Sequence, residues 1–151
     1  MAEYELDEKP GEEGNLPNAK DLIDKIEVGD SISSMVVISQ GLVLFGALNK
    51  TFYALDKETG RPAWEFRTGG QIFWDVGVYG DKVYFGSFDG YFYRLTIADG
   101  KLVWKYYAGN RIVTGATIAD GKVHFGCDDG THFCLSLEGG LLWKFKVPLS
   151  R

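Results

Sequence analysis

The chain of 151 residues is 45% apolar and carries a net charge of −5, so it has enough apolar material to bury a core of one domain's size. Ten of its 21 acidic residues lie within residues 1–30, and the remainder is close to neutral, which argues against a nucleic-acid or membrane-surface partner. No apolar run reaches the roughly 18 residues of a membrane span and the N-terminus is acidic, so we expect a cytoplasmic protein.

Residues 1–20 are predicted to form an acidic, flexible tail. This segment contains Pro10, Gly11 and Gly14 and few apolar side chains, so it cannot offset the entropy cost of its own ordering. Residues 21–31 differ from the tail, because residues 25–32 (KIEVGDSI) align with residues 65–72 (EFRTGGQI) 40 positions later. We therefore expect residues 22–28 to form an extra outer strand of a blade that the chain does not contain.

From residue 32 onward the sequence repeats every 40 residues. An apolar tetrapeptide ending in glycine occurs at residues 43–46 (VLFG), 83–86 (VYFG) and 123–126 (VHFG). A tryptophan follows each copy, at Trp64, Trp104 and Trp143. Each repeat contains four short apolar runs separated by glycine or Asp-Gly turn signals, which predicts four β-strands. Four strands with a period of about 40 residues are typical of a propeller blade.

The predicted fold class is all-β, a β-propeller fragment of three four-stranded blades over residues 32–151. The expected strands are 32–38, 42–46, 51–55 and 62–66; then 72–78, 82–86, 91–95 and 101–106; then 112–118, 122–126, 131–135 and 141–147. Propellers close with about four to eight blades, so three blades leave two apolar faces without a partner. We expect a homodimer that closes a six-bladed ring, latched by residues 22–28; assembly with another propeller piece is the second option, and a truncated chain is the third.

Residues 54–64 (ALDKETGRPAW) resemble the tryptophan-docking motif of the pyrroloquinoline-quinone-like, or quinoprotein-type, β-propeller repeat family. That pattern places Ala, Asp, Thr, Gly and Trp at these spacings, and the later blades keep the glycine and the tryptophan. The resemblance implies that each tryptophan packs between neighbouring blades. A large aromatic side chain whose N–H finds a partner in a turn fits that position.

The resemblance does not imply that this chain binds the quinone cofactor. Quinone-dependent dehydrogenases of the family use a complete propeller, a calcium ion held by acidic and amide side chains, and an Asp base; several also hold the quinone against a disulfide of adjacent cysteines. Here Cys127 and Cys134 are not adjacent, and no acidic cluster lies outside the turns. We expect no cofactor, no metal, no catalytic residues and therefore no enzymatic activity.

One hairpin of the third repeat gathers His124, His132, Cys127 and Cys134. Two or three of these side chains could share a face, either as a metal site or as packing groups between blades. Their spacing matches no zinc motif, which favours packing. Two cysteines are too few for a disulfide framework, so we expect reduced thiols.

The predicted binding surface lies where the repeats diverge, in the loops between blades. Trp74 is the only tryptophan outside the repeated series and is followed by Asp75, while Asn110 and Arg111 lie in the next such loop. These four residues are the candidate binding site; the alternative for the unrepeated Trp74 is packing in the central channel. The sequence therefore predicts a non-enzymatic binding or scaffold module for protein partners, with no nucleic-acid or membrane role; the alternative is a fragment of a quinone-dependent dehydrogenase or of a small-ligand sensor propeller.

Overall fold

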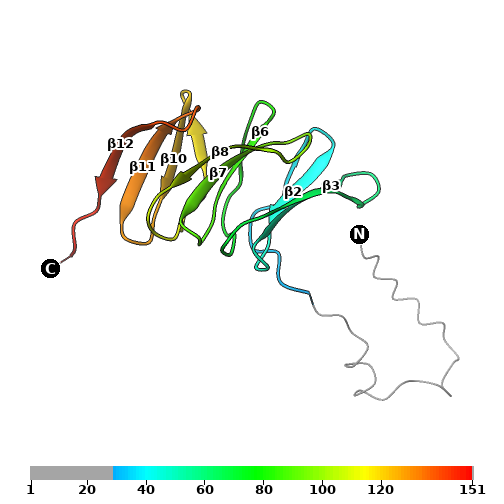
Figure 1. The fold of residues 1–151 in the computed structure, drawn as a ribbon, viewed down its shortest axis with the longest axis horizontal. Coiled ribbons are helices and arrows are strands. Elements are labelled where there is room, and N and C mark those ends of the chain that lie inside the picture. Colours follow the sequence, from blue (N-terminus) through cyan, green and yellow to red (C-terminus); the bar gives the residue numbers. More distant parts are fainter. Residues whose placement is uncertain (1–28, 151) are drawn as a thin grey trace, which may run out of the picture.

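The structure is a computed structural model that describes residues 29–150, which form three four-stranded antiparallel sheets (Figure 1). The first sheet contains β1 (Val37–Ser39), β2 (Leu42–Gly46), β3 (Thr51–Asp56) and β4 (Pro62–Arg67). The second contains β5 (Gly77–Tyr79), β6 (Lys82–Gly86), β7 (Tyr91–Thr96) and β8 (Leu102–Tyr107). The third contains β9 (Thr117–Ala119), β10 (Lys122–Gly126), β11 (Thr131–Ser136) and β12 (Leu141–Lys146).

Within each sheet every strand pairs with its neighbour in the sequence, and the three sheets stand side by side in chain order (Figure 1). The all-β prediction with three four-stranded blades is confirmed. The expected tail over residues 1–20 and the expected outer strand over residues 22–28 lie outside the described residues. No helix within residues 29–150 is long and apolar enough to cross a membrane.

The first strand of each blade is shorter than predicted. The sequence indicated seven residues at 32–38, 72–78 and 112–118, whereas β1, β5 and β9 have three each. The preceding residues run between two blades and bond to both: the Val113 N–H, for example, donates a 3.0 Å hydrogen bond to the Gly126 carbonyl within its own blade. Trp74 has a left-handed φ of 74°, which also interrupts an extended strand. The predicted apolar runs therefore lie at the right positions, but the first half of each run packs between two blades and is not part of the strand.

Two glycines of the repeated tetrapeptide allow neighbouring blades to approach closely. A Cβ atom at Gly46 would lie 2.3 Å from the Cγ2 of Ile72, and one at Gly86 would lie 2.2 Å from the Cγ2 of Ile112. Both isoleucines belong to the following blade and are buried. The repeated glycine is therefore required by the isoleucine that packs on it.

Aromatic rings fill the two interfaces between blades. Phe52 stacks on Phe85 and Phe92 stacks on Phe125, each pair with its ring centroids 4.3 Å apart. These rings belong to two core clusters, one for each pair of successive blades. Most of the core is thus made between blades.

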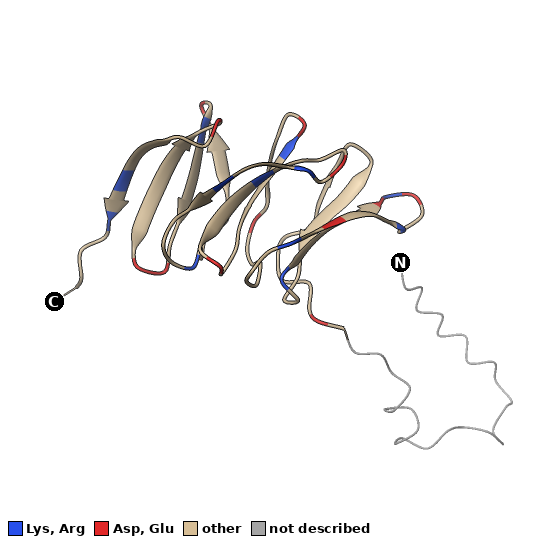
Figure 2. Cartoon of the chain, viewed as in Figure 1, with Lys and Arg blue, Asp and Glu red and all other residues tan. Residues whose placement is uncertain are grey.

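The predicted packing of the repeated tryptophans is confirmed for two of the three. Trp64 and Trp104 are half-buried, and each donates its indole N–H to a carbonyl oxygen in the next blade. Trp143 is 48% exposed, and no blade follows it within the described residues. Over the described range, charged residues of both signs lie mostly at turns and along the outer strands (Figure 2).

Candidate functional site

Trp74 lies on the connection between β4 and β5, at a point where the backbone is strained. Its φ of 74° is uncommon for a bulky residue, and its side chain is 52% exposed. The backbone is held in place from the first blade, because the Trp74 carbonyl accepts a 2.9 Å hydrogen bond from the Met35 N–H. Residues with a strained backbone are concentrated at functional sites, so the outward-facing Trp74 is a candidate binding residue.

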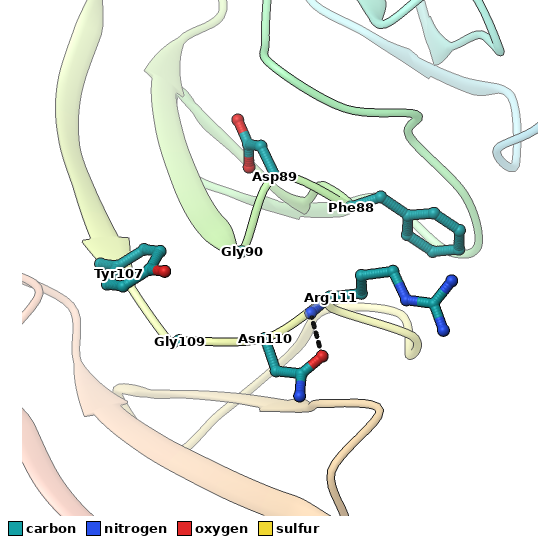
Figure 3. A pocket seen from close by; sticks show the side chains of 7 residues that line it. All are labelled: Phe88, Asp89, Gly90, Tyr107, Gly109, Asn110 and Arg111. Carbon is teal, nitrogen blue, oxygen red and sulfur yellow. Dashed lines mark hydrogen bonds between the residues drawn. The ribbon is translucent and has the colours of Figure 1, made fainter.

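An aromatic row extends from Trp74 across the second blade to Arg111, and we use this name for Trp74, Phe73, Phe88 and Arg111. The ring centroids of Trp74 and Phe73 lie 6.2 Å apart, and those of Phe73 and Phe88 lie 4.7 Å apart. The Arg111 Cζ atom lies 5.2 Å from the centroid of Phe88, within cation–π range, and Figure 3 shows the guanidinium beside that ring. Trp74 and Arg111, 37 residues apart in the sequence, therefore belong to one surface.

A cavity of about 230 Å³ adjoins the end of the aromatic row. It is lined by Phe88, Asp89, Gly90, Tyr107, Gly109, Asn110 and Arg111 (Figure 3). The Asn110 side chain accepts a 2.8 Å hydrogen bond from the Arg111 N–H, and the Arg111 guanidinium forms an ion pair with Asp128 in the third blade. Arg111 is therefore held between an aromatic face and a carboxylate.

Asp89 supports this cavity structurally. Its carboxylate accepts hydrogen bonds from the Tyr91 N–H at 2.8 Å, from the Gly69 N–H at 2.9 Å and from the Tyr93 hydroxyl. Burial, and then the hydrogen bond to Asp89, raise the pKa of Tyr93 well above its usual range, so the phenol stays a neutral donor. The Asp89 carboxylate is engaged by three donors and is poorly placed to bind a ligand.

The predicted site residues do not all come together. Asn110 and Arg111 line the cavity and Trp74 joins Arg111 through the aromatic row, but Asp75 lies apart from them. Asp75 lines a second cavity of about 300 Å³ whose other residues are Thr114, Gly115, Thr117, His124, Phe125 and His132. Its carbonyl also accepts a 3.1 Å hydrogen bond from the Ala116 N–H. Asp75 faces the third blade, so the structure does not bring it together with Arg111.

Sequence reasoning missed Phe88 and Asp128, which place Arg111. A signal existed, because residues 48, 88 and 128 occupy one repeat position and read Leu, Phe and Asp. Divergence at that position is as strong as the divergence that singled out Trp74. Both residues lie in the turn after the repeated tetrapeptide, where the sequence pattern predicts a turn and no binding residue.

The histidines and cysteines of the third blade come together only in part. The Nδ1 atom of His124 lies 3.0 Å from the Nε2 atom of His132, and the Cys134 Sγ atom lies 3.8 Å from the other ring nitrogen of His124. Cys127 points elsewhere, toward the Asn110 carbonyl, and burial raises its pKa to about 12. Both cysteines are free thiols, and residues 29–150 contain no group of three His, Cys, Asp or Glu side chains arranged to hold a metal.

Comparison with known proteins relates the chain to one family. The family model described as outer membrane protein assembly factor BamB matches residues 11–151. The crystal structure of BamB from Moraxella catarrhalis has 25% identity and a TM-score of 0.67, over 78% of this chain and 38% of that chain. The chain therefore spans less than half the length of that relative. No curated protein matches.

Two further solved structures share the fold at lower identity. The computationally designed Ika4 protein has 19% identity and a TM-score of 0.67, over 79% of this chain and 74% of that chain. The quinohemoprotein alcohol dehydrogenase from Comamonas testosteroni has 22% identity and a TM-score of 0.65, over 77% of this chain and 21% of that chain. At these identities the likeness concerns the fold alone.

Proposed function

Since the chain belongs to the family of pyrroloquinoline-quinone-like β-propeller repeats, whose model is described as outer membrane protein assembly factor BamB, we propose a function of the same general kind. The chain is a non-enzymatic binding or scaffold module for protein partners. The observation that carries the proposal is the aromatic row. It presents an exposed Trp74 and an aromatic-stacked Arg111 on one surface. Tryptophan and arginine are among the residues that contribute most to protein interfaces.

The dimensions of this surface favour a protein over a small molecule. The adjoining cavity of about 230 Å³ is smaller than the roughly 300–1,000 Å³ of most small-molecule pockets. The carboxylate of Asp89 inside it already accepts three hydrogen bonds. Trp74 lies outside the cavity, where an opposing surface could cover it.

The proposal includes a second copy of the chain as a partner, in a homodimer that closes a ring. It is supported by the first blade, where Val43 is only half-buried although its repeat equivalents Val83 and Val123 are fully buried. We place the module in the cytoplasm, without a cofactor. The free thiols of Cys127 and Cys134 are compatible with a reducing compartment.

Affinity enrichment from cells that express the full chain tests the scaffold role. Trp74→Ala is compared with Tyr79→Ala, because both side chains are 52% exposed and Tyr79 lies outside the aromatic row. We expect at least one protein, quantified by mass spectrometry, to be retained by the wild type and by Tyr79→Ala and lost with Trp74→Ala. Retention that is indifferent to Trp74→Ala would contradict the assignment of this surface.

A further inference from the structure

The first and third blades carry the two halves of an interface that the chain makes twice within itself. In each internal interface the earlier blade supplies a tryptophan and an aromatic ring, and the later blade supplies a socket. We call the exposed side of the third blade the leading face, defined by Trp143, Phe145 and His132. We call the exposed side of the first blade the receiving face, defined by Val43, Phe45, Tyr53, Leu55 and the turn 56–60.

The socket for tryptophan has the same construction in both internal interfaces. Trp64 packs on Gly100, where a Cβ atom would lie 2.4 Å from the indole, and its N–H donates a 2.8 Å hydrogen bond to the Ile97 carbonyl. Trp104 packs on Gly139 and donates a 2.9 Å hydrogen bond to the Leu137 carbonyl. A glycine turn below the ring and a carbonyl at its edge define the socket.

The first blade contains a third socket of this kind. Forty residues before Ile97 and Gly100 lie Lys57 and Gly60. A cavity of about 420 Å³ is found there, lined by Val43, Leu55, Asp56, Lys57, Glu58, Thr59 and Gly60. No tryptophan of the described residues lines this cavity. Of the three repeated tryptophans, Trp64 and Trp104 occupy the other two sockets, and Trp143 is exposed.

The turn of this socket is held in place without a partner. One carboxylate oxygen of Asp56 accepts hydrogen bonds from the N–H groups of Glu58 and Thr59, both at 2.9 Å, and these bonds hold the pKa of Asp56 below its usual range. The Gly60 N–H donates a 2.8 Å hydrogen bond to the Asp56 carbonyl, and Gly60 has the left-handed φ of 73° that favours glycine. A socket built before its ligand arrives costs less ordering entropy on binding.

The leading face presents the matching side chains. Phe145 is 58% exposed, whereas its equivalents Phe66 and Tyr106 pack edge-on against the next blade. The partners of those two rings are Tyr93 and Phe133, at centroid distances of 5.5 and 5.8 Å. The residue at that repeat position in the first blade is Tyr53. His132 occupies the position of Phe52 and Phe92, whose partners Phe85 and Phe125 correspond to Phe45.

The pattern of exposure agrees with this matching. The residues Val43, Phe45, Tyr53 and Leu55 of the receiving face are half-buried. Their equivalents in the later blades are 0–5% exposed: Val83, Phe85, Tyr93, Leu95, Val123, Phe125, Phe133 and Leu135. Ile32 is 56% exposed, whereas Ile72 and Ile112, which pack on glycines of the preceding blade, are at most 2% exposed. The glycine in the equivalent position of the third blade is Gly126.

We propose that Trp143 of one copy inserts into the socket of Val43, Leu55 and the turn 56–60 of a second copy, so that two copies join head to tail. The inference rests on the homodimer proposed above and specifies its interface. The occupant is a second copy because the two faces continue, residue for residue, the interface already formed between the blades. Two copies joined in this way contain six blades, within the about four to eight with which propellers close.

Light scattering of the purified full chain tests the docking, with Trp143→Ala and Val43→Arg as the disruptive variants. Both side chains are partly exposed, so the fold should persist, which circular dichroism checks. Leu142→Ala is the matched control, since Leu142 is 50% exposed on the same strand and the equivalent Ala63 and Val103 are exposed in the other blades. We expect the mass of two chains for the wild type and the control, and at least about a 30-fold weaker association for each disruptive variant.

Mixing the two disruptive variants adds a test of direction. In a head-to-tail ring, a dimer of one chain of each variant has both substitutions at one of its two interfaces and none at the second interface. Dimers should therefore reappear in the mixture. Association that neither substitution weakens, or that mixing fails to restore, would overturn the docking while leaving a homodimer possible by another surface. A wild-type mass of one chain at micromolar concentration would overturn the homodimer itself.

Discussion

The indole N–H of Trp104 on β8 donates a 2.9 Å hydrogen bond to the carbonyl oxygen of Leu137, which lies 33 residues later in the next blade. The ring also packs on Gly139 and lies 6.1 Å from Phe92, centroid to centroid. One side chain thus connects two blades through a polar and an apolar contact.

Trp104→Ala should lower the free energy of unfolding by about 3–5 kcal/mol, because it removes a large ring from between two blades and leaves the Leu137 carbonyl without its donor. Trp74→Ala, at a 52% exposed position, should cost less than about 1 kcal/mol. Urea denaturation followed by circular dichroism gives both values. A larger loss for Trp74→Ala would mean that the division between structural and surface tryptophans is wrong.

Trp74→Gly should be more stable than Trp74→Ala by about 1 kcal/mol. The φ of 74° at this position strains any residue with a Cβ atom, and glycine adopts it freely. Thermal melts of the two variants, which both lack the indole, isolate the backbone contribution. Equal stability would indicate that the left-handed conformation at residue 74 is not maintained in solution.

Gly86→Ala should destabilise the fold by about 1–3 kcal/mol, since the new Cβ atom would lie 2.2 Å from the Cγ2 of Ile112. Gly126→Ala is the control at the same repeat position in the third blade, because the atom nearest to its new Cβ, the Cγ2 of Thr114, lies farther away, at 3.0 Å. Denaturation in the Trp143→Ala background keeps association out of the comparison. Additional replacement of Ile112 by Ala should recover part of the loss in Gly86→Ala.

Stability and association should both fall as the pH drops below about 6.5, because of His132. Burial, and then the neighbouring His124, lower the pKa of His132 from its ordinary value of 6.5. The folded chain therefore binds fewer protons than the unfolded chain in this window, so its stability rises with pH and is lost on acidification. The groups around His132 are His124 on β10 and Trp143 on β12, with Asp75 lining the same cavity.

His132→Phe is the matched variant for this prediction. It restores the ring found at Phe52 and Phe92 and removes the titrating group. Melting temperatures and light-scattering masses between about pH 5.5 and 7.5 should vary less in this variant than in the wild type. An identical pH profile for both chains would place the sensitivity elsewhere.

Incubation of the full chain with pyrroloquinoline quinone and calcium, followed by desalting, should leave no bound chromophore. The expectation follows from the scaffold role proposed above. Absorbance spectroscopy checks it, with an unrelated acidic protein as the control. A band equivalent to one quinone per chain would favour the alternative of a dehydrogenase fragment or ligand sensor.

The sequence alone determined the four-stranded blades and their number, and its resemblance to the repeat family implied the packing of Trp64 and Trp104. The blades depend on alternating apolar side chains and glycine turns, which are local in the chain, and their number can be read from the recurrence of this pattern about every 40 residues. The repeat also singled out Trp74 as the tryptophan without repeated equivalents, but it left open whether the side chain packs in the channel or is exposed.

Only the tertiary structure decided which of the residues that break the repeat lie on the same surface. Arg111 joins Trp74 through Phe73 and Phe88, whereas Asp75, adjacent to Trp74 in the sequence, faces the third blade. The three-residue length of β5 likewise depends on the backbone at Trp74 and on Ile72 packing against Gly46 of the preceding blade. The physical reason is that contacts between blades join residues about 20–40 positions apart, and which side of a blade a loop residue faces depends on a backbone turn that no local pattern specifies.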